Sequence, residues 1–527
     1  MSTRSTLILG ILLALILCAL PRPAAAGCPE VLAFLTDKAV GATCFHVDDL
    51  RVPNPPTAPV TPANNSITTF ADGTPLPGPT AFGSAFSFTP VTDLGVISNG
   101  PAPTPSAVPG IQVEGWFAHD PTNEARFLLR FPDTWNGKLV VAGASGTRSE
   151  FNGDWAWSDY VLPQGYAYAS QNKGVLNLYF ASLASATQPA TDPLACRLNP
   201  SSTLWAHFYD NDPQKPFTQW THYMILTTRL AQEAVKENYH HHAHRTYAVG
   251  TSNGGYQVRR ALEEAPEIFD GGVDWEGTFI DPRGPNILID LPPAIKNFPA
   301  YQASGYDPNS AAAQNIEAAG YPPDIVNHDP TTHAVTDSLW LHYSNSFWEV
   351  TACQWQERFD PTYNTYGSGL GNYDYLSRIH TVHGVFRSVD KVETTGDIGK
   401  PLITVAGTMD ALLPIKRGAR AYEHKVLESR RHHHEDWGKD DREDERDGHH
   451  HPAYRLYEVQ NGNHIEANVT FFPQLVIIQP HAQTAFDLLV DHVEHHQPLP
   501  PSQCIPKGGA IAQNPTEPGH CTNLFVP

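Results

Sequence analysis

Residues 245–264 read RTYAVGTSNGGYQVRRALEE, and this stretch indicates the fold of the chain. An apolar run ends at Gly250, a tight turn carries Ser252, and a helical pattern follows from Tyr256. Glycines at 250 and 254 suit a turn that has strained dihedral angles and close backbone contacts. The pentapeptide therefore matches the G-x-S-x-G nucleophile elbow, in the strand–turn–helix context that this motif requires.

Short apolar runs of the same kind recur on both sides of the elbow. Between the apolar run 166–170 and the elbow, residues 216–239 carry apolar side chains at helical spacing. Strands that alternate with helices predict a mostly parallel sheet covered by helices on both faces, which is an α/β fold. The other runs are FLLRF (127–131), KLVVAG (138–143), YAYAS (166–170), GGVDW (271–275), PLITVAG (401–407) and YRLYEV (454–459).

Two further residues are predicted to act with the elbow serine. A serine hydroxyl needs a base, and the base needs a carboxylate that orients it. In this architecture the acid and the histidine follow the serine in chain order. Asp410 ends the run PLITVAGTMD, and His464 lies in NGNHIEA after the strand YRLYEV, so these are the predicted partners of Ser252. Asp274 and Glu276 end the preceding strand and are the rival acids.

An oxyanion formed at the serine would need two backbone N–H donors. The elbow presents the N–H of Asn253, which directly follows the serine. The second donor is expected in the loop 143–146, GASG, whose small residues let backbone N–H groups point inward. Ala144 is the predicted donor, and the sequence leaves the other three residues open.

Segments of different composition interrupt and extend this core. Residues 278–398 are too long for a connection and are dense in aromatic residues, which predicts a lid or substrate domain. Residues 428–452 are almost entirely charged or histidine, which predicts a disordered or weakly helical surface loop. The expected division is a signal peptide (1–26), an extended or irregular N-terminal region (27–112), the first part of the core (113–277), the lid (278–398), the second part of the core with the charged insert (399–500) and a C-terminal tail (501–527).

The first segment has the pattern of an export signal. Arg4 precedes the apolar run of residues 7–20, and Ala24 to Ala26 offer a small-residue cleavage site. Fourteen apolar residues are too few to span a bilayer. We therefore expect the mature chain to begin near Gly27 and to be secreted or periplasmic.

The cysteines agree with an exported chain. Six remain after Cys18 is removed with the signal, and an even number in an oxidising compartment suggests disulfides. Proximity in sequence favours two local pairs and leaves the last two cysteines for each other, although the sequence alone does not exclude the other pairings. The favoured pairs are Cys28–Cys44, Cys504–Cys521 and Cys196–Cys353.

Composition and charge exclude several classes of function. With 41% hydrophobic residues, the chain can bury a large core. Lys+Arg 34 against Asp+Glu 55 gives a net charge of −21, which repels phosphate backbones and anionic lipids. We therefore expect no nucleic-acid or membrane partner. The histidine runs at 240–242, 432–434 and 449–451 lack metal-ligand spacing, so no metal or other cofactor is expected.

Short motifs surround the elbow along the chain. They are WNGK (135–138) followed by VVAGASG, GYA (165–167) followed by YASQNKG, the elbow with its helix and PEIFDGG turn, ITVAGTMDALLP, and NGNHIEA. Together they resemble the tannase and feruloyl esterase family over roughly 130–277 and 400–490. That resemblance implies an α/β-hydrolase fold with a large lid insertion, and cleavage of carboxylic esters, often of phenolic acids. The cysteines that this family carries before the serine and after the histidine are replaced here by Thr251 and Ile465.

The sequence therefore predicts a secreted serine esterase that acts on a small-molecule ester, with phenolic acid esters as the first expectation. Secreted hydroxyalkanoate-oligomer hydrolases, which have the same triad and small aliphatic esters, are the alternative. A peptidase or acyltransferase would differ only in the leaving group or the acceptor. A non-catalytic binding protein on the same scaffold is the lower alternative, because all three triad positions are filled.

Overall fold

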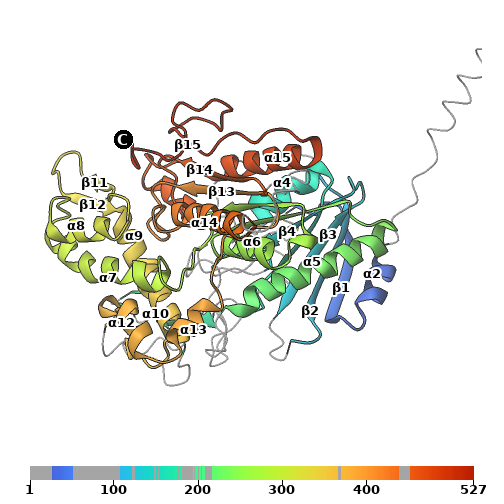
Figure 1. Ribbon diagram of the computed structural model, residues 1–527, viewed down its shortest axis with the longest axis horizontal. Coiled ribbons are helices and arrows are strands. Elements are labelled where there is room, and N and C mark those ends of the chain that lie inside the picture. The colour runs from blue at the N-terminus through green and yellow to red at the C-terminus, as the bar shows by residue number, and fades with distance from the viewer. Residues whose placement is uncertain are drawn as a thin grey trace, which may run out of the picture.

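The computed structural model describes residues 27–51, 107–120, 125–146, 150–151, 154–174, 179–180, 194, 196–199, 201–202, 205–207, 217–365, 369–437 and 451–527. Figure 1 shows a central sheet flanked by helices, with a group of helices beside one end of it. The expected signal peptide (1–26) lies outside the described residues, as do residues 52–106.

The main sheet has ten strands in the order β1-β2-β3-β5-β4-β9-β10-β13-β14-β15. From β5 to β15 in this order, each strand is parallel to its neighbour. The pairs β1–β2, β2–β3 and β3–β5 are antiparallel. From β2 to β14 this is the α/β-hydrolase order, with one reversed strand near the edge. The strands are β1 (Ala39–Val47), β2 (Gly110–Phe117), β3 (Arg126–Pro132), β4 (Lys138–Gly143), β5 (Ala167–Gln171), β9 (Arg245–Thr251), β10 (Gly271–Trp275), β13 (Leu402–Gly407), β14 (Tyr454–Val459) and β15 (Gln503–Ile505).

Helices cover both faces of this sheet, as the alternation of its side chains requires. In β4, Leu139 and Val141 belong to one apolar cluster while Val140 and Ala142 belong to another. Successive residues of a strand point to opposite faces, so the two clusters are the two faces of the sheet. The first face packs against α2 (Cys28–Leu35), α5 (Thr218–Tyr239), α6 (Asn253–Glu264) and α14 (Ala419–Trp437), and the second packs against α4 (Asp159–Val161) and α15 (Gln479–His495).

The segment between β10 and β13 forms a helical region of its own, at the left of Figure 1. Its aromatic side chains fill a separate core, in which Trp340, Trp348 and Trp355 are each at most 1% exposed. Because β10 and β13 are neighbours in the sheet, this insertion lies directly beside the ends of two central strands. Its elements are α7 (Ile287–Ala303), α8 (Ala311–Ala318), β11 (Val326–His328), β12 (Val335–Ser338), α9 (Leu339–Ser346), α10 (Trp348–Phe359), α12 (Tyr375–Thr381) and α13 (Val385–Asp390).

Short elements complete the described part of the chain. A small three-stranded sheet has the order β6-β8-β7. Its strands are β6 (Tyr179–Phe180), β7 (Cys196–Arg197) and β8 (Trp205–His207), and the remaining single turns are η3 (Asp154–Ser158), η4 (Leu162–Gln164), η5 (Pro266–Ile268), η6 (Leu370–Asn372) and η7 (Glu466–Thr470). No helix in the described ranges is both long and apolar enough to cross a membrane.

The three expected disulfides are present. Cys28 bonds to Cys44, Cys196 to Cys353 and Cys504 to Cys521. The first links α2 to β1, and the second fastens β7 to helix α10 of the insertion. The disulfide prediction is therefore confirmed.

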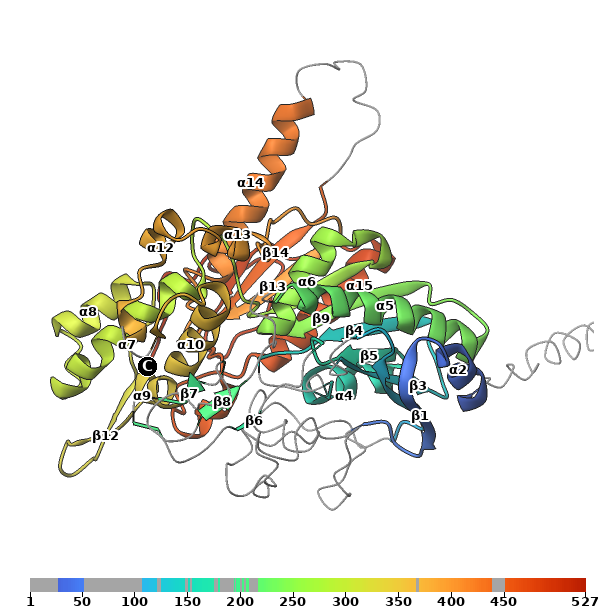
Figure 2. The same cartoon turned by 90° about the horizontal axis from the view of Figure 1, so that it is seen from below.

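Two segments carry elements that the sequence expectation did not include, and a third is helical as far as it is described. The region 27–112 was expected to be extended or irregular, yet it contributes α2 and the edge strand β1. The tail 501–527 contributes β15, and Val526 N–H donates to Asn461 Oδ1 at 2.8 Å. Helix α14 runs through residue 437 and projects from the molecule in Figure 2, while residues 438–450 of the charged insert lie outside the described part. Strands β1 and β15 each pair with a strand from a distant part of the chain, and the local sequence pattern does not encode such pairing.

Candidate active site

The serine stands at a sharp turn between β9 and α6. Ser252 has φ 58° and ψ −121°, a conformation that costs a non-glycine residue free energy and that the surrounding structure must enforce. Its N–H donates to Trp275 O at 2.9 Å, and its carbonyl accepts from Tyr256 N at 3.0 Å. A Cβ at Gly250 would lie 2.3 Å from Gly254 O, so the turn can close only with glycine there. The structure therefore forms the elbow that the motif predicts.

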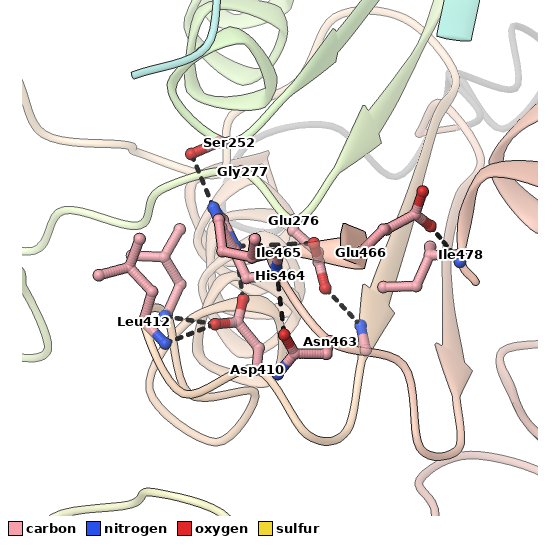
Figure 3. A network of polar contacts seen from close by, with 12 residues as sticks. Ser252, Glu276, Gly277, Asp410, Leu412, Asn463, His464, Ile465, Glu466 and Ile478 are labelled. Carbon is pink, nitrogen blue, oxygen red and sulfur yellow. Dashed lines mark hydrogen bonds and ion pairs between the residues drawn. The ribbon is translucent and has the colours of Figure 1, made fainter. Parts of the chain in front are cut away.

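Ser252, His464 and Asp410 lie in one line (Figure 3). The Ser252 Oγ is 3.0 Å from His464 Nε2, and His464 Nδ1 is 2.8 Å from Asp410 Oδ2. An ionised carboxylate only accepts hydrogen bonds, so Nδ1 carries the proton and Nε2 is left to accept from the serine hydroxyl. All three residues are buried, with exposures of 9%, 6% and 1%. The geometry brings together the three residues named from the sequence.

Asp410 is held in place by its own loop. Its Oδ1 accepts hydrogen bonds from the N–H groups of Leu412 and Leu413, both at 2.7 Å. These contacts leave Oδ2 directed at His464. The carboxylate is thus fixed before any substrate arrives, which is the preorganisation that such a site needs.

The helical insertion supports both catalytic loops. Tyr343 of α9 donates through its hydroxyl to Asn463 Oδ1 at 2.8 Å, next to the histidine. Asn463 in turn donates to Met409 O at 2.5 Å, next to the aspartate. Trp348 of α10 donates through Nε1 to Ala411 O at 2.7 Å. These hydrogen bonds between the insertion and the two loops help to fix the positions of Asp410 and His464.

The charge of the site acts on His464. Burial alone would lower its pKa, but attraction to the Asp410 carboxylate, the hydrogen bond to it and the charge of Glu276 outweigh burial. Together they raise the pKa of His464 from 6.5 to about 9. The imidazolium form that a base acquires when it removes a proton is therefore well stabilised here.

The two rival acids have different surroundings. Asp274 is fully buried, and its carboxylate contacts Arg259 Nε at 2.5 Å, Thr404 Oγ1 at 2.9 Å and Gly277 N at 2.7 Å. It is committed to these partners. Glu276, by contrast, places Oε2 3.6 Å from His464 Nδ1. The sequence could not separate these two acids, because both end the same strand.

The predicted oxyanion donor, the Asn253 N–H, lies directly after Ser252 in the chain. Asn253 is the first residue of α6, and the first N–H groups of a helix have no partner within the helix. Its side-chain Oδ1 accepts from Thr278 Oγ1 at 2.8 Å, which orients the residue. The N-terminus of α6 therefore directs N–H groups and a partial positive charge toward the space beside Ser252.

Ala144 does not fit the role expected of it. Its N–H donates to Gln257 Oε1 at 2.9 Å, toward helix α6. Gln257 is held in turn by a 2.6 Å hydrogen bond from its Nε2 to Trp220 O. The sequence offered one signal for this: Gln257 follows the nucleophile by five residues on a helix packed against β4.

A buried lysine, also missed at the sequence level, holds the same loop. Lys173 is fully buried, and its Nζ donates to the carbonyls of Ser145 and Gly146. It lies 5.2 Å from the centre of the Trp220 ring. A trans peptide points its N–H opposite to the preceding C=O, so the Gly146 N–H is directed away from Lys173.

Among the described residues, one group of at least three potential metal ligands was found, and it consists of Glu276, Asp410 and His464. Their ligating atoms lie within 4.8 Å of one another. His464 Nδ1 already contacts Asp410, and Nε2 faces the serine. This donor set is therefore used by the triad.

Comparison with known proteins supports part of this picture. A family model described as 3HB-oligomer hydrolase matches residues 371–520, a range that contains Asp410 and His464. D-(-)-3-hydroxybutyrate oligomer hydrolases of Burkholderia thailandensis and Burkholderia mallei are each 29% identical over 141 residues. Those matches cover 25% of this chain and 17% of each relative, so the chain spans about a sixth of the length of the relatives it matches.

Solved esterase structures align with this chain at low identity and with TM-scores below 0.5. Feruloyl esterase B from Aspergillus oryzae has a TM-score of 0.43 and 11% identity, covering 89% of this chain and 90% of that one. Tannin acyl hydrolase from Aspergillus niger has a TM-score of 0.42 and 11% identity, covering 82% and 89%. The chain has an α/β-hydrolase fold and, over residues 371–520, is similar to the 3HB-oligomer hydrolase family.

Proposed function

We propose that this protein is a carboxylic ester hydrolase that works through Ser252, His464 and Asp410. The observation that carries the proposal is the continuous contact from Ser252 Oγ to His464 at 3.0 Å and from His464 to Asp410 at 2.8 Å. The strained elbow that presents the serine supports the same reading.

In this mechanism the serine oxygen attacks the ester carbonyl carbon while His464 Nε2 removes the hydroxyl proton. The tetrahedral intermediate collapses as the C–O bond to the alcohol breaks, and the imidazolium returns the proton to that alcohol. Water, deprotonated by the same histidine, then attacks the acyl-enzyme and releases the acid. Asp410 keeps the proton on Nδ1 and stabilises the imidazolium throughout.

The oxyanion of that intermediate would accept from two N–H groups. We assign the first to Asn253 at the start of α6 and the second to Gly146 instead of Ala144. Two observations support Gly146: the Ala144 N–H is taken by Gln257, and a Cβ at Gly146 would lie only 3.9 Å from Asn253 Nδ2. Lys173 orients the peptide between Ser145 and Gly146.

For the substrate we favour a small aliphatic ester of the 3-hydroxybutyrate oligomer class. The match of residues 371–520 to 3HB-oligomer hydrolases supports this choice, and it includes two of the three triad residues. Phenolic acid esters are the competing class, because the motifs around the elbow resemble those of the tannase and feruloyl esterase family.

Purified protein incubated with a 3-hydroxybutyrate dimer and with methyl ferulate tests this directly, with the Ser252→Ala variant as the blank. We expect serine-dependent release of acid from the dimer. Serine-dependent cleavage of the ferulate alone would move the protein to the phenolic class. If the protein cleaves neither of these esters and also fails to cleave simple p-nitrophenyl esters, the proposed activity is contradicted.

The pH dependence provides a separate prediction. Only neutral His464 can act as a base, and its pKa is raised to about 9, so it is protonated below that pH. We expect kcat/KM to rise with pH along a limb centred well above 6.5, the ordinary pKa of histidine. Two esters with different leaving groups serve as the control, since both must give the same limb if it belongs to the free enzyme. A limb centred at or below 6.5 would contradict the prediction.

We also propose that the protein works outside the cytosol. Three disulfides support this, because disulfides form and persist in oxidising compartments and are rare in cytosolic proteins.

A further inference from the structure

A second carboxyl group faces the nitrogen of His464 that Asp410 contacts. Glu276 directly follows β10, and Asp410 follows the neighbouring strand β13, so the two acids come from adjacent strands. Glu276 Oε2 lies 3.6 Å from His464 Nδ1, where Asp410 Oδ2 lies at 2.8 Å. Figure 3 shows both side chains directed at the end of the histidine ring that faces away from Ser252.

The backbone holds Glu276 firmly in this position. Glu276 has φ 52°, in the left-handed region that non-glycine residues seldom adopt. Its N–H donates to Val405 O at 2.8 Å, and its Oε1 accepts from Gly407 N at 3.0 Å. The strain is maintained beside the elbow, because the preceding carbonyl, Trp275 O, accepts from Ser252 N. The side chain therefore has little freedom to leave the histidine.

The other oxygen of Glu276 has no hydrogen-bond partner. Glu276 is 3% exposed, and Oε2 makes no hydrogen bond to any residue in the described parts of the chain. A buried carboxyl oxygen without a partner costs free energy, so its position calls for an explanation. It is directed at the one ring nitrogen that carries the proton needed for catalysis.

Two carboxylates this close in a buried site do not both ionise readily. Burial and the negative charge of Asp410 raise the pKa of Glu276 from 4.5 to about 8. The negative charge of Glu466 also raises the pKa of Glu276. The charge of His464 and the hydrogen bond from the Gly407 N–H lower it. The Tyr343 hydroxyl is a further titratable group that interacts with Glu276. Glu276 therefore binds a proton more readily than an ordinary glutamate, while Asp410 makes the shorter contact with the histidine.

We propose that Glu276 is a positioning residue for His464, a second carboxyl that confines the imidazole beside Asp410 and replaces Asp410 as its acceptor when that side chain is removed. The proposal rests on the proposed esterase function. Without Asp410 the repulsion on Glu276 disappears, which favours its carboxylate form, and Oε2 needs to move by less than about 1 Å to accept from Nδ1–H.

A set of single and double variants tests this role. In serine–histidine–aspartate sites, loss of the acid alone reduces kcat by about 10⁴-fold. If Glu276 can replace the missing acid, Asp410→Ala is expected to lower kcat by only about 100-fold. The double variant Asp410→Ala/Glu276→Gln is expected to lower kcat by about 10⁴-fold. Glu276→Gln alone is expected to lose less than about tenfold, since glutamine still accepts from the Gly407 N–H. Such non-additivity is what a shared partner produces.

Glu466 offers a matched control, because it is equally buried and lies two residues from the histidine. Its Oε1 accepts from Ile478 N and Gln479 N, at the start of α15. Glu466→Gln in the Asp410→Ala background removes a nearby charge without removing the carboxyl at Nδ1. We expect no further loss beyond about threefold. If Glu466→Gln lowered the activity of Asp410→Ala as much as Glu276→Gln does, the loss would reflect the removal of any nearby negative charge. That result would overturn the proposal.

The pH profile gives a readout that a merely structural role would not move. In Asp410→Ala the working form of Glu276 is the carboxylate, which is lost as the pH falls through its pKa. The residual activity should therefore show an acid limb that disappears together with that activity in the double variant. Asp410→Asn, whose Oδ1 can still accept from Leu412 and Leu413, replaces Asp410→Ala if the latter does not fold.

Titration of His464 by NMR separates this proposal from the esterase assignment. The resonance is assigned by its absence in His464→Gln. We expect the pKa of His464 to stay above 6.5 in Asp410→Ala and to fall when Glu276→Gln is added. Equal pKa values in the two variants, or a 10⁴-fold loss of activity from Asp410→Ala alone, would overturn the role of Glu276. Absence of any ester hydrolysis by the wild type would refute the proposed function, while this titration would still decide the role of Glu276.

Discussion

Ser252→Ala is expected to lower kcat for ester hydrolysis by about 10⁴- to 10⁶-fold. The change removes the oxygen that forms the acyl bond, so no covalent intermediate can arise. What remains is the smaller acceleration from oxyanion donors and substrate binding, typically about 10³- to 10⁴-fold over water. A nucleophile therefore gives the largest single effect that this site can show.

The fold should survive that substitution. The backbone contacts of Ser252 with Trp275 and Tyr256 do not involve the side chain, and alanine leaves no large cavity. Thermal unfolding should therefore shift little, while single-turnover and steady-state rates both collapse. Ser170→Ala is a matched control, because Ser170 is also buried and its hydroxyl donates to a backbone carbonyl, that of Glu150. It should keep activity within about threefold. Retention of most activity by Ser252→Ala would mean that another group attacks the ester.

Gly254→Ala is expected to destabilise the protein by about 3 kcal/mol or more and to abolish activity. A Cβ on Gly254 would lie 2.5 Å from Gly143 O and 2.8 Å from Gly143 C. Both contacts are with the backbone of β4, so neither can be relieved by a side-chain rotation. Alanine is better than glycine in a helix by only about 1 kcal/mol, so the steric clash decides the sign.

Urea unfolding of the two proteins, with activity measured alongside, checks this prediction. Moving α6 away from β4 displaces both Ser252 and the Asn253 N–H, which is why activity is lost with stability. Gly418→Ala is the control, because a Cβ there would meet its nearest atoms, Leu413 O and Pro414 O, at 3.5 Å, an ordinary contact. That variant should change stability by less than about 1 kcal/mol. A fully active, stable Gly254→Ala protein would show that the elbow tolerates a side chain.

Local features of the sequence determined the strands and the elbow. A strand followed by G-x-S-x-G and a helical pattern predicts the elbow turn, and the structure has Ser252 at that turn between β9 and α6. Asp410 and His464 could be named because each follows an apolar strand, and parallel strands bring their ends to one edge. Proximity in sequence favoured Cys28–Cys44 and Cys504–Cys521, whereas Cys196–Cys353 remained by elimination, and the sequence did not exclude other pairings.

Tertiary structure alone decided the contacts across strands and the course of the chain ends. Asp274 and Glu276 end the same strand, yet one contacts Arg259 and the other faces His464. The Ala144 N–H is engaged by a glutamine that lies 113 residues away in the chain. Residues 39–47 look irregular alone and become a strand because β2 offers them an edge to pair with. Steric restriction and hydrophobic period act over a few residues and can be read from sequence. Hydrogen-bond partners and buried charges depend on which distant segments meet, and only the folded chain fixes that.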